Sequence, residues 1–171
     1  LPNGRIVVYE GMFQVADTPD KLAIVLGHEI GHAVAQHSNE RATQEQLTNS
    51  AVNIVGAVLG GENTQSQQMM QAVLGMGAQA GLILPYSRKH EYEADQLGLI
   101  FMSLAGYDPT TAPGFWEAMS AQGTSNVSDF LSTHPSDAKR VANINKHMDE
   151  AKAYASASGT KLVSNHATKI K

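Results

Sequence analysis

The 171-residue sequence predicts a mostly α-helical protein with a small β-sheet, which is the α+β class. Apolar residues recur at helical spacing in Leu22–Val34, and the nearly uncharged segment Asn49–Pro85 has two apolar runs of helical length. The run Arg5–Tyr9 is instead rich in β-branched residues and follows the turn-forming pair Asn3–Gly4, which is typical of a strand. The chain length and a hydrophobic content of 42% fit one domain with its own core.

The net charge and the cysteine count narrow the classes of function. With a net charge of −4 and few aromatic residues, the chain has no basic stripe for nucleic acid, and we expect no nucleic-acid partner. Because the sequence has no cysteine, any zinc ion must be held by histidines and carboxylates alone. The chain begins at Leu1 without a methionine, so we expect a processed or truncated piece whose signal peptide or lipid anchor lies upstream.

The first predicted helix begins near Thr18, which is suited to the N-cap, and Pro19, which is suited to the first helical position. Its apolar residues nearly encircle it, as is typical of a buried central helix. We expect the polar stretch Gln36–Thr48 to continue this helix outward.

This helix carries His28 and His32, which are four residues apart, so both imidazoles can reach one ion from the same face. Glu29 lies beside that ion. His-Glu-x-x-His on a helix is typical of zinc peptidases, because histidine nitrogens bind zinc and the carboxylate takes a proton from the water that zinc activates. The simpler alternative is a helix with two surface histidines and no metal site.

The segment Asn49–Pro85 contains one charged residue, Glu62, and predicts a helical hairpin with its turn at 60–63. Glutamines and glycines interrupt both apolar runs, so neither half matches a membrane span, which needs roughly 18–20 unbroken apolar residues. A membrane-touching flap, an oligomer contact, core helices and a mobile cover over the active site all remain open. Core helices or a cover are favoured over membrane contact.

A later helix presents Glu91 and Asp95, again four residues apart and on one face. One carboxylate can complete a His-His-Glu zinc set, while the other accepts the N–H of a ligand histidine. Glu93 points to another side of the helix and cannot share this task. Taken alone, Glu91 is more typical of a solvated charge on an exposed helix, and only the upstream histidine pair favours the metal-binding interpretation.

Two motifs together resemble those of the HtpX and CAAX-prenyl-protease family of zinc metallopeptidases: His28-Glu29-x-x-His32, and Ser87-Arg88-x-x-Glu91-x-Glu93-Ala94-Asp95-x-x-Gly98. The opening stretch 1–11 and the sequence Thr133-His134-Pro135 resemble further parts of the family, so the resemblance covers roughly residues 1–145. The chain is most like the soluble members, the periplasmic and mitochondrial-stress-protease branch, because no segment here matches the membrane spans that integral members place between the two motifs.

The resemblance implies a zincin-type (gluzincin) metallopeptidase domain with one zinc ion per chain, bound by His28, His32 and Glu91. Glu29 would polarise the water and later protonate the leaving amine. Asp95 would stand behind the ligand histidines and fix the orientation of one ring.

The resemblance also implies roles for His134 and for Arg140, six residues further on. His134 would approach the metal, either as a reversible fourth ligand that closes the site or as a donor to the tetrahedral oxyanion. Arg140 would support His134 or the substrate. From the residues alone, a histidine before proline at a helix entry is more typical of a cap or a surface position.

The expected function is hydrolysis of peptide bonds in unfolded or misassembled proteins, as in protein quality control. The alternatives are a latent zinc-bearing chaperone or assembly factor with little proteolysis, and a structural zinc domain in which His134 is the fourth ligand. Expected partners are protein and peptide substrates, with a possible peripheral membrane or assembly-machinery contact through 49–85. A periplasmic or outer-membrane-associated location is favoured, and the mitochondrial inner membrane, facing the intermembrane space, is the alternative. The oligomeric state is not predicted.

The remaining elements frame this site. Gly106 is expected to end the Glu91 helix, and Asp108 and Pro109 to start another helix that carries Phe115 and Trp116 to the core. A loop is expected at 122–129, followed by a last helix from Ser136 to about Ala153. We expect one catalytic domain, 1–155, and a loosely ordered tail, 156–171.

Four histidines are expected to lie outside the metal site. His37 lies about 140° round the helix from His32, and His90, His147 and His166 are expected at the surface. Separately, the strand Arg5–Tyr9 is a candidate template for an extended substrate, with an ordinary internal strand as the alternative.

Overall fold

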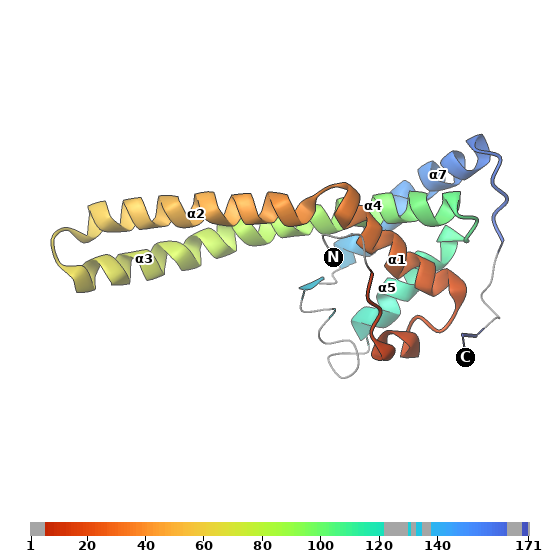
Figure 1. Ribbon diagram of the computed structural model, residues 1–171, viewed down its shortest axis with the longest axis horizontal. Coiled ribbons are helices and arrows are strands. Elements are labelled where there is room, and N and C mark those ends of the chain that lie inside the picture. The colour runs from red at the N-terminus through yellow and green to blue at the C-terminus, as the bar shows by residue number, and fades with distance from the viewer. Residues whose placement is uncertain (1–5, 122–129, 131–132, 135–137, 164–168, 171) are drawn as a thin grey trace. The chain divides into compact units, whose positions relative to one another are not determined.

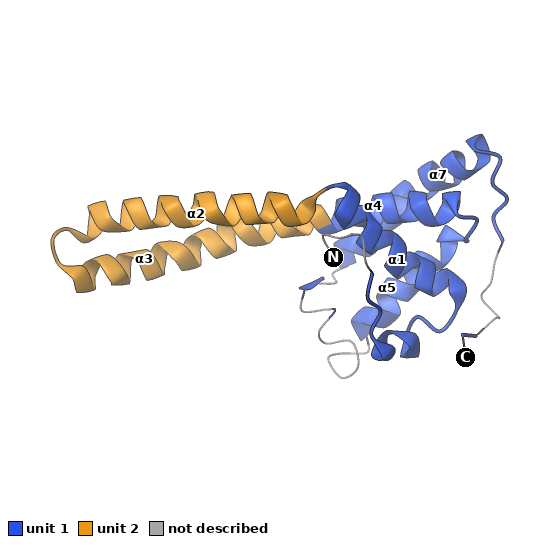
Figure 2. Cartoon of the chain, viewed as in Figure 1, with its two compact units in different colours: residues 1–35, 91–171 blue, residues 36–90 orange. Residues whose placement is uncertain are grey.

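A computed structural model describes residues 6–121, 130, 133–134, 138–163 and 169–170 (Figure 1). The chain divides into two compact units, residues 1–35 with 91–171 and residues 36–90 (Figure 2). The described part of the chain is mostly helical, which confirms the predicted predominance of helix. Within it, no helix is long and apolar enough to span a lipid bilayer.

The first unit is built from helices α1 (Pro19–Val34), α5 (Ala112–Ala121) and α7 (Ala138–Ala157), together with the part of α4 (Leu84–Leu104) that follows His90. Two short 3₁₀ turns, Glu10–Gln14 and Pro109–Thr111, precede α1 and α5. The helices bury one apolar core, which includes Ile24, Leu99, Met102, Phe115, Trp116, Met119 and Ile144. Phe115 and Trp116 therefore lie in the core, as predicted.

The start of α1 has the predicted chemistry. The Thr18 side chain accepts a hydrogen bond from the backbone N–H of Lys21 at 3.3 Å, and Pro19 occupies the first turn. Gly106, with a φ of 90°, follows the end of α4, and Asp108 caps the next turn by accepting from the N–H of Thr110. These caps confirm the predicted helix boundaries.

Helices α1 and α4 meet backbone to backbone. A Cβ atom on Gly27 would lie 2.7 Å from the carbonyl oxygen of Gly98, and one on Gly31 would lie 2.8 Å from that of Ala94. Only glycine allows this approach at Gly27 and Gly31. Because His28 and Asp95 lie next to these contacts in the sequence, the close crossing brings them within hydrogen-bonding distance of each other.

The predicted small β-sheet is not seen among the described residues. Residues Ile6–Tyr9 form no strand, and the described chain holds only one isolated parallel bridge, between Tyr107 and Val163. A strand needs a neighbour to pair its backbone N–H and C=O groups, and the β-branched composition alone supplies none. The strand prediction is therefore wrong for these residues, and with it the sheet-edge template for substrate; Arg5 and the preceding residues lie outside the described part.

The second unit is a helical hairpin of α2 (His37–Gly60) and α3 (Thr64–Ala78), followed by a π-helical turn, Gln79–Ile83, that leads into α4. Gly61 makes the turn with a φ of 64°, and the side chain of Asn63 caps α3. The predicted hairpin and its turn are confirmed. The start of α2 differs from the prediction, because Gln36, in the left-handed region, ends the run of α1 and begins a new helix.

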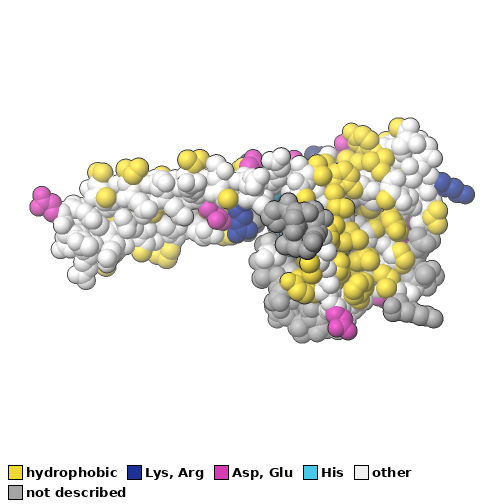
Figure 3. Space-filling view, in the orientation of Figure 1, with side chains coloured by type: hydrophobic (Ala, Val, Ile, Leu, Met, Phe, Trp, Pro, Cys, Tyr) yellow, Lys and Arg dark blue, Asp and Glu magenta, His cyan; other side chains and the backbone are white. Residues whose placement is uncertain are grey.

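Much of the hairpin's apolar surface is exposed. Seven large apolar side chains on α2 and α3 are each more than half exposed: Leu47, Ile54, Val58, Leu59, Met69, Val73 and Met76. Figure 3 shows hydrophobic side chains at the surface along the hairpin, with few charged ones among them. These side chains are therefore not core residues of this unit, which contradicts the core-helix interpretation and leaves a cover, an oligomer contact or a membrane contact.

Candidate metal centre and catalytic site

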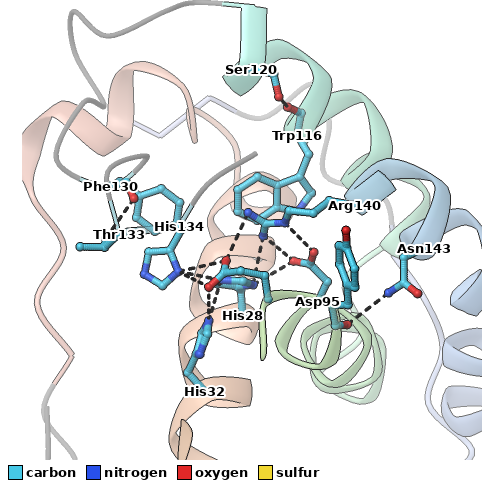
Figure 4. Close-up of polar contacts among 12 residues, drawn as sticks. His28, His32, Asp95, Trp116, Ser120, Phe130, Thr133, His134, Arg140 and Asn143 are labelled. Carbon is cyan, nitrogen blue, oxygen red and sulfur yellow. Dashed lines mark hydrogen bonds and ion pairs between the residues drawn. The ribbon is translucent and has the colours of Figure 1, made fainter. Parts of the chain in front are cut away.

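Four segments supply the candidate site, all in the first unit. Helix α1 carries the adjacent His28 and Glu29 and, one turn later, His32, and α4 carries Glu91 and Asp95. His134 comes from the described residues 133–134, and Arg140 from α7. Figure 4 shows the rings of His28, His32 and His134 with their nitrogens turned toward one another, and Asp95 between His28 and Arg140.

The atoms of four side chains converge on one point. The Nε2 atom of His28 lies 3.1 Å from Nε2 of His32 and 3.2 Å from Nδ1 of His134. The carboxylate of Glu91 completes the group, at 3.4 Å from His28 Nε2, 3.2 Å from His32 Nε2 and 3.2 Å from His134 Nδ1. The donor set is thus three imidazole nitrogens and one carboxylate.

The hydrogen bonds behind these atoms set their chemistry. The Nδ1–H of His28 donates to Asp95 Oδ1 at 2.9 Å, so a neutral His28 turns an unprotonated Nε2 toward the cluster. The Nε2 atom of His134 lies 3.3 Å from Glu29 Oε1, and a proton there leaves Nδ1 of that ring as an acceptor. Several acceptors therefore face one another, an arrangement that a cation stabilises.

A zinc ion fits this donor set. Zinc binds histidine nitrogens and carboxylate oxygens at about 2.0–2.2 Å, so the edges of its ligand tetrahedron measure about 3.3 Å. The five separations given above, 3.1–3.4 Å, are close to that value. His28, His32 and Glu91 are therefore spaced as three zinc ligands would be, with Nδ1 of His134 where a fourth ligand would lie.

Asp95 is held from behind by Arg140. The guanidinium donates through Nη2 to Asp95 Oδ1 at 2.7 Å and through Nε to Oδ2 at 2.8 Å, and its Nη1 lies 3.3 Å from Glu91 Oε2. Arg140 is only 1% exposed and stacks over the Trp116 ring at 4.0 Å. One buried cation thus holds the two buried carboxylates of α4, Glu91 and Asp95, in place.

Burial and neighbouring charged groups shift the pKa values of Glu91, Asp95 and His28 in opposite directions. Burial raises the pKa of Glu91, but the contacts with His134, His28 and His32 hold it far below its ordinary value. Burial likewise raises the pKa of Asp95, and hydrogen bonds from Arg140 and His28 outweigh it. Burial lowers the pKa of His28, yet Asp95 and Glu91 bring it above the ordinary value. Both carboxylates are therefore ionised at neutral pH.

The site is open to solvent on one side. The side chain of Glu29 is 36% exposed and those of His32 and His134 are 16% exposed, whereas His28 and Asp95 are fully buried. Phe130 stacks on the His134 ring at 4.6 Å. A substrate can therefore reach Glu29 and His134 while the groups behind the ligands stay dry.

The structure brings together every predicted site residue: His28, Glu29, His32, Glu91, Asp95, His134 and Arg140. Sequence reasoning placed Trp116 in the core but did not predict its stack with Arg140, and it missed Phe130; no local pattern marks either contact. Glu93 is exposed and points away, as predicted. His147 is partly exposed, and His166 and the loop 122–129 lie outside the described residues.

One histidine prediction is wrong. His90 is buried, because its ring stacks on that of His37, with the ring centres 4.1 Å apart. Both residues belong to the second unit and are separate from the candidate metal centre, which includes neither.

A helical His-Glu-x-x-His pair that is completed by a glutamate from a second helix defines the zinc-metallopeptidase class of site. The comparison with protein families agrees, since the profile of peptidase family M48 matches residues 1–148. The chain belongs to peptidase family M48.

Several curated proteins are similar to this chain. It is 39% identical over 153 residues to the mitochondrial metalloendopeptidase OMA1 of Schizosaccharomyces pombe, covering 88% of this chain and 43% of that protein. It is 39% identical over 140 residues to OMA1 of Arabidopsis thaliana, covering 82% and 27%. The beta-barrel assembly-enhancing protease of Yersinia pestis is 30% identical over 162 residues, covering 91% and 33%.

The chain spans less than half the length of each of these relatives. No solved structure gives a significant match to it.

Proposed function

We propose that this chain is the catalytic part of a zinc metalloendopeptidase that hydrolyses peptide bonds in unfolded or misassembled proteins. The observation that carries the proposal is the convergence of His28, His32 and Glu91 within 3.1–3.4 Å, with the carboxylate of Glu29 on the open side. A binding module has no need of a base at that position. The metalloendopeptidase names of the relatives support the same reaction.

Each side chain has a distinct task in the proposed reaction. A bound zinc ion supplies Lewis-acid chemistry, which favours attack of water on the peptide carbonyl. Glu29 accepts the proton of the attacking water and delivers it to the leaving amine, so the peptide bond breaks without net proton uptake. The Nε2–H of His134 faces the open side, where it can donate to the developing oxyanion.

Asp95 and Arg140 position the site without touching substrate. Asp95 accepts from His28 Nδ1 and so fixes which ring nitrogen faces the metal. Arg140 holds Asp95 by two hydrogen bonds and restrains Glu91. The arrangement orients the ligands before the metal arrives, which reduces the ordering cost of binding.

The domain arrangement and the location are part of the proposal. Residues 1–155 act as one catalytic domain that contains the hairpin of α2 and α3, and residues 156–171 follow as a tail. The exposed apolar side chains of the hairpin contact clients, an assembly machine or a membrane surface. The proposed setting is the bacterial periplasm or outer membrane, with the mitochondrion as the alternative; the names of the OMA1 relatives support the mitochondrion, and that of the beta-barrel assembly-enhancing protease supports a link to outer-membrane assembly.

A second candidate, a latent zinc-bearing chaperone, is favoured by the same exposed hairpin. Glu29→Gln separates the two, because it removes the base and keeps the proposed ligands. For a protease, this variant retains zinc and loses cleavage of an unfolded protein such as reduced casein. Full retention of client effects together with zinc would support the chaperone instead.

The ligand assignment has its own matched pair of variants. Glu91→Gln weakens zinc binding by at least about tenfold, because an amide is a poorer ligand than a carboxylate. Glu93→Gln, an exposed neighbour on the same helix, leaves zinc binding at the wild-type value. Equal zinc affinity for the two variants, measured by competition with a chromogenic chelator, would contradict the assignment.

A further inference from the structure

A second cluster of histidine and carboxylate side chains lies wholly in the hairpin unit, whose residues 36–90 are orange in Figure 2. His37 is the first residue of α2, Glu40 follows one turn later, and His90 lies on the part of α4 that belongs to this unit. One potential ligand atom from each lies within 4.8 Å of the other two. His90 Nε2 and Glu40 Oε2 are 3.0 Å apart.

The backbone places His37 by an unusual conformation. Gln36 has a φ of 58°, and it is the sole non-glycine residue with a positive φ in the described chain. Such a conformation costs free energy of order 1 kcal/mol or more in a non-glycine residue, so it persists where the surrounding structure fixes it. Helix α2 begins directly after Gln36, at His37. His37 and Glu40 are three residues apart and therefore lie on the same helix face.

Two of the three residues, both histidines, are buried. His37 and His90 are 3% and 6% exposed, while Glu40 keeps one side toward solvent. Tyr86 packs edge-on against His90, with ring centres 4.5 Å apart. Hydrogen bonds from Tyr86 and His90 hold the pKa of Glu40 below its ordinary value, so this carboxylate is ionised.

We propose that His37, Glu40 and His90 form a second divalent-metal site, of the zinc class, in the hairpin unit. Two imidazoles and one carboxylate are a recognised ligand set for zinc, with one position left for water. The proposal is independent of catalysis, since none of the three residues belongs to the peptidase site.

Binding requires one ring to turn. The imidazoles are stacked, with an angle of 14° between their planes, and the lone pair of each nitrogen lies in its ring plane. Rotation about χ2 of one histidine directs both nitrogens to one ion, and this torsion between sp³ and sp² atoms is soft. Because of this rearrangement and the wider spacing of its ligands, the second site is expected to bind zinc more weakly than the first.

The test counts zinc ions on the full chain in the Glu29→Gln background, which prevents self-cleavage and keeps the peptidase ligands. The chelator-treated protein is dialysed against increasing zinc, and bound metal is measured by mass spectrometry. The expected result is a second equivalent that binds after the first. In histidine-selective ¹⁵N NMR, that second equivalent shifts the ring nitrogens of His37 and His90.

Variants show which residues bind the second zinc equivalent. Glu40→Gln changes an exposed side chain, so the fold is retained, and it should weaken the second equivalent at least about tenfold, the loss typical of an impaired metal site. His90→Gln should abolish it, and neither variant should change the first. The matched control is Glu150→Gln, because His147 Nδ1 and Glu150 Oε2 form a similar contact at 2.9 Å that belongs to no three-residue cluster in the described chain.

Two outcomes would overturn the proposal. One is a single zinc equivalent at saturation. The other is a second equivalent that persists in Glu40→Gln or disappears in Glu150→Gln, which would assign it to adventitious surface binding. Loss of the first equivalent in Glu91→Gln while the second remains would support the second site even if the peptidase function were wrong.

Discussion

Asp95 and Arg140 form a fully buried, two-point ion pair, with Oδ1–Nη2 and Oδ2–Nε distances of 2.7 and 2.8 Å. Each side chain is 1% exposed, and the same carboxylate accepts from His28. The pair therefore joins α4 and α7 and fixes the ring of a proposed metal ligand. Removing one partner leaves the other charge buried without compensation.

The first prediction concerns this pair. Arg140→Gln should lower the free energy of unfolding by about 3–5 kcal/mol, the cost typical of breaking a buried pair. The control is Arg41→Gln, which breaks an exposed pair with Glu45 on α2 and should cost less than about 1 kcal/mol. Urea unfolding of both variants, followed by circular dichroism, gives the comparison. Similar costs for the two would show that burial does not govern the Arg140 pair.

The second prediction concerns the crossing of α1 and α4. A methyl group at Gly27 or Gly31 would meet backbone atoms at 2.7–2.8 Å, so Gly27→Ala and Gly31→Ala should each destabilise the protein by about 1–3 kcal/mol. Both should also weaken zinc binding, because the helices that carry His28 and Asp95 must separate.

The control for the glycine variants is Gly114→Ala. A Cβ atom at Gly114 meets nothing within 4 Å, so this change within α5 should be neutral or stabilising by up to roughly 1 kcal/mol. Thermal unfolding and zinc titration of the three variants check both statements. A stable Gly27→Ala variant with unchanged zinc affinity would contradict the backbone contact.

The parts of the site that depend on residues within one helical turn could be predicted from the sequence. The cap at Thr18 and the spacing of His28 and His32 depend on residues a few positions apart, and so do Glu91 and Asp95 on α4. The hairpin turn was predictable for the same reason. Each of these features follows from the period of the helix and from the glycines and capping residues at its ends.

Long-range contacts account for what the sequence did not reveal. The stack of His90 on His37 joins residues 53 positions apart, so no local pattern marks His90 as buried. The left-handed conformation of Gln36 could not be predicted, because glutamine, unlike glycine or asparagine, is not a residue typical of that conformation. A strand depends on a partner, and the β-branched run at Ile6–Tyr9 has none among the described residues.

The third prediction concerns pH and the end of the chain. Hydrogen bonds from Lys21 and Lys169 lower the pKa of Asp17 below 3.8, and the backbone N–H of Ile170 donates to the Asp17 carbonyl at 2.8 Å. A carboxylate with a depressed folded pKa stabilises the fold above its unfolded pKa, and the effect is lost as the pH falls through the folded value. The Ile170 contact should therefore weaken below about pH 3.8.

Amide hydrogen exchange of Ile170 measures this effect directly. Protection should fall as the pH is lowered through the depressed pKa of Asp17, beyond the intrinsic change in exchange rate, in the wild type. In Asp17→Asn it should be low over the whole pH range. Because Lys169 is exposed, the effect on global stability is small. Asp149→Asn, an exposed carboxylate change on α7, serves as the control and should leave the Ile170 profile unchanged.

The last prediction concerns His134. Its Nδ1 lies 3.2 Å from both His28 Nε2 and Glu91, and its Nε2 lies 3.3 Å from Glu29, so the ring stands between the proposed ligands and the proposed base. As a fourth ligand it closes a site that needs an open position for catalysis. Withdrawn from the metal, the same ring is placed to donate to the oxyanion.

His134→Ala should therefore keep its zinc, because His28, His32 and Glu91 remain, while the control of cleavage changes. Loss of an oxyanion donor lowers kcat by about 10²–10³-fold, whereas loss of a closing ligand raises self-cleavage. Zinc content, cleavage of an unfolded protein and self-cleavage are measured together, with the partly exposed His147→Ala as the control. Either change at intact zinc occupancy supports a role at the metal. Wild-type values for zinc content, cleavage rate and self-cleavage would return His134 to the role of a cap or surface residue.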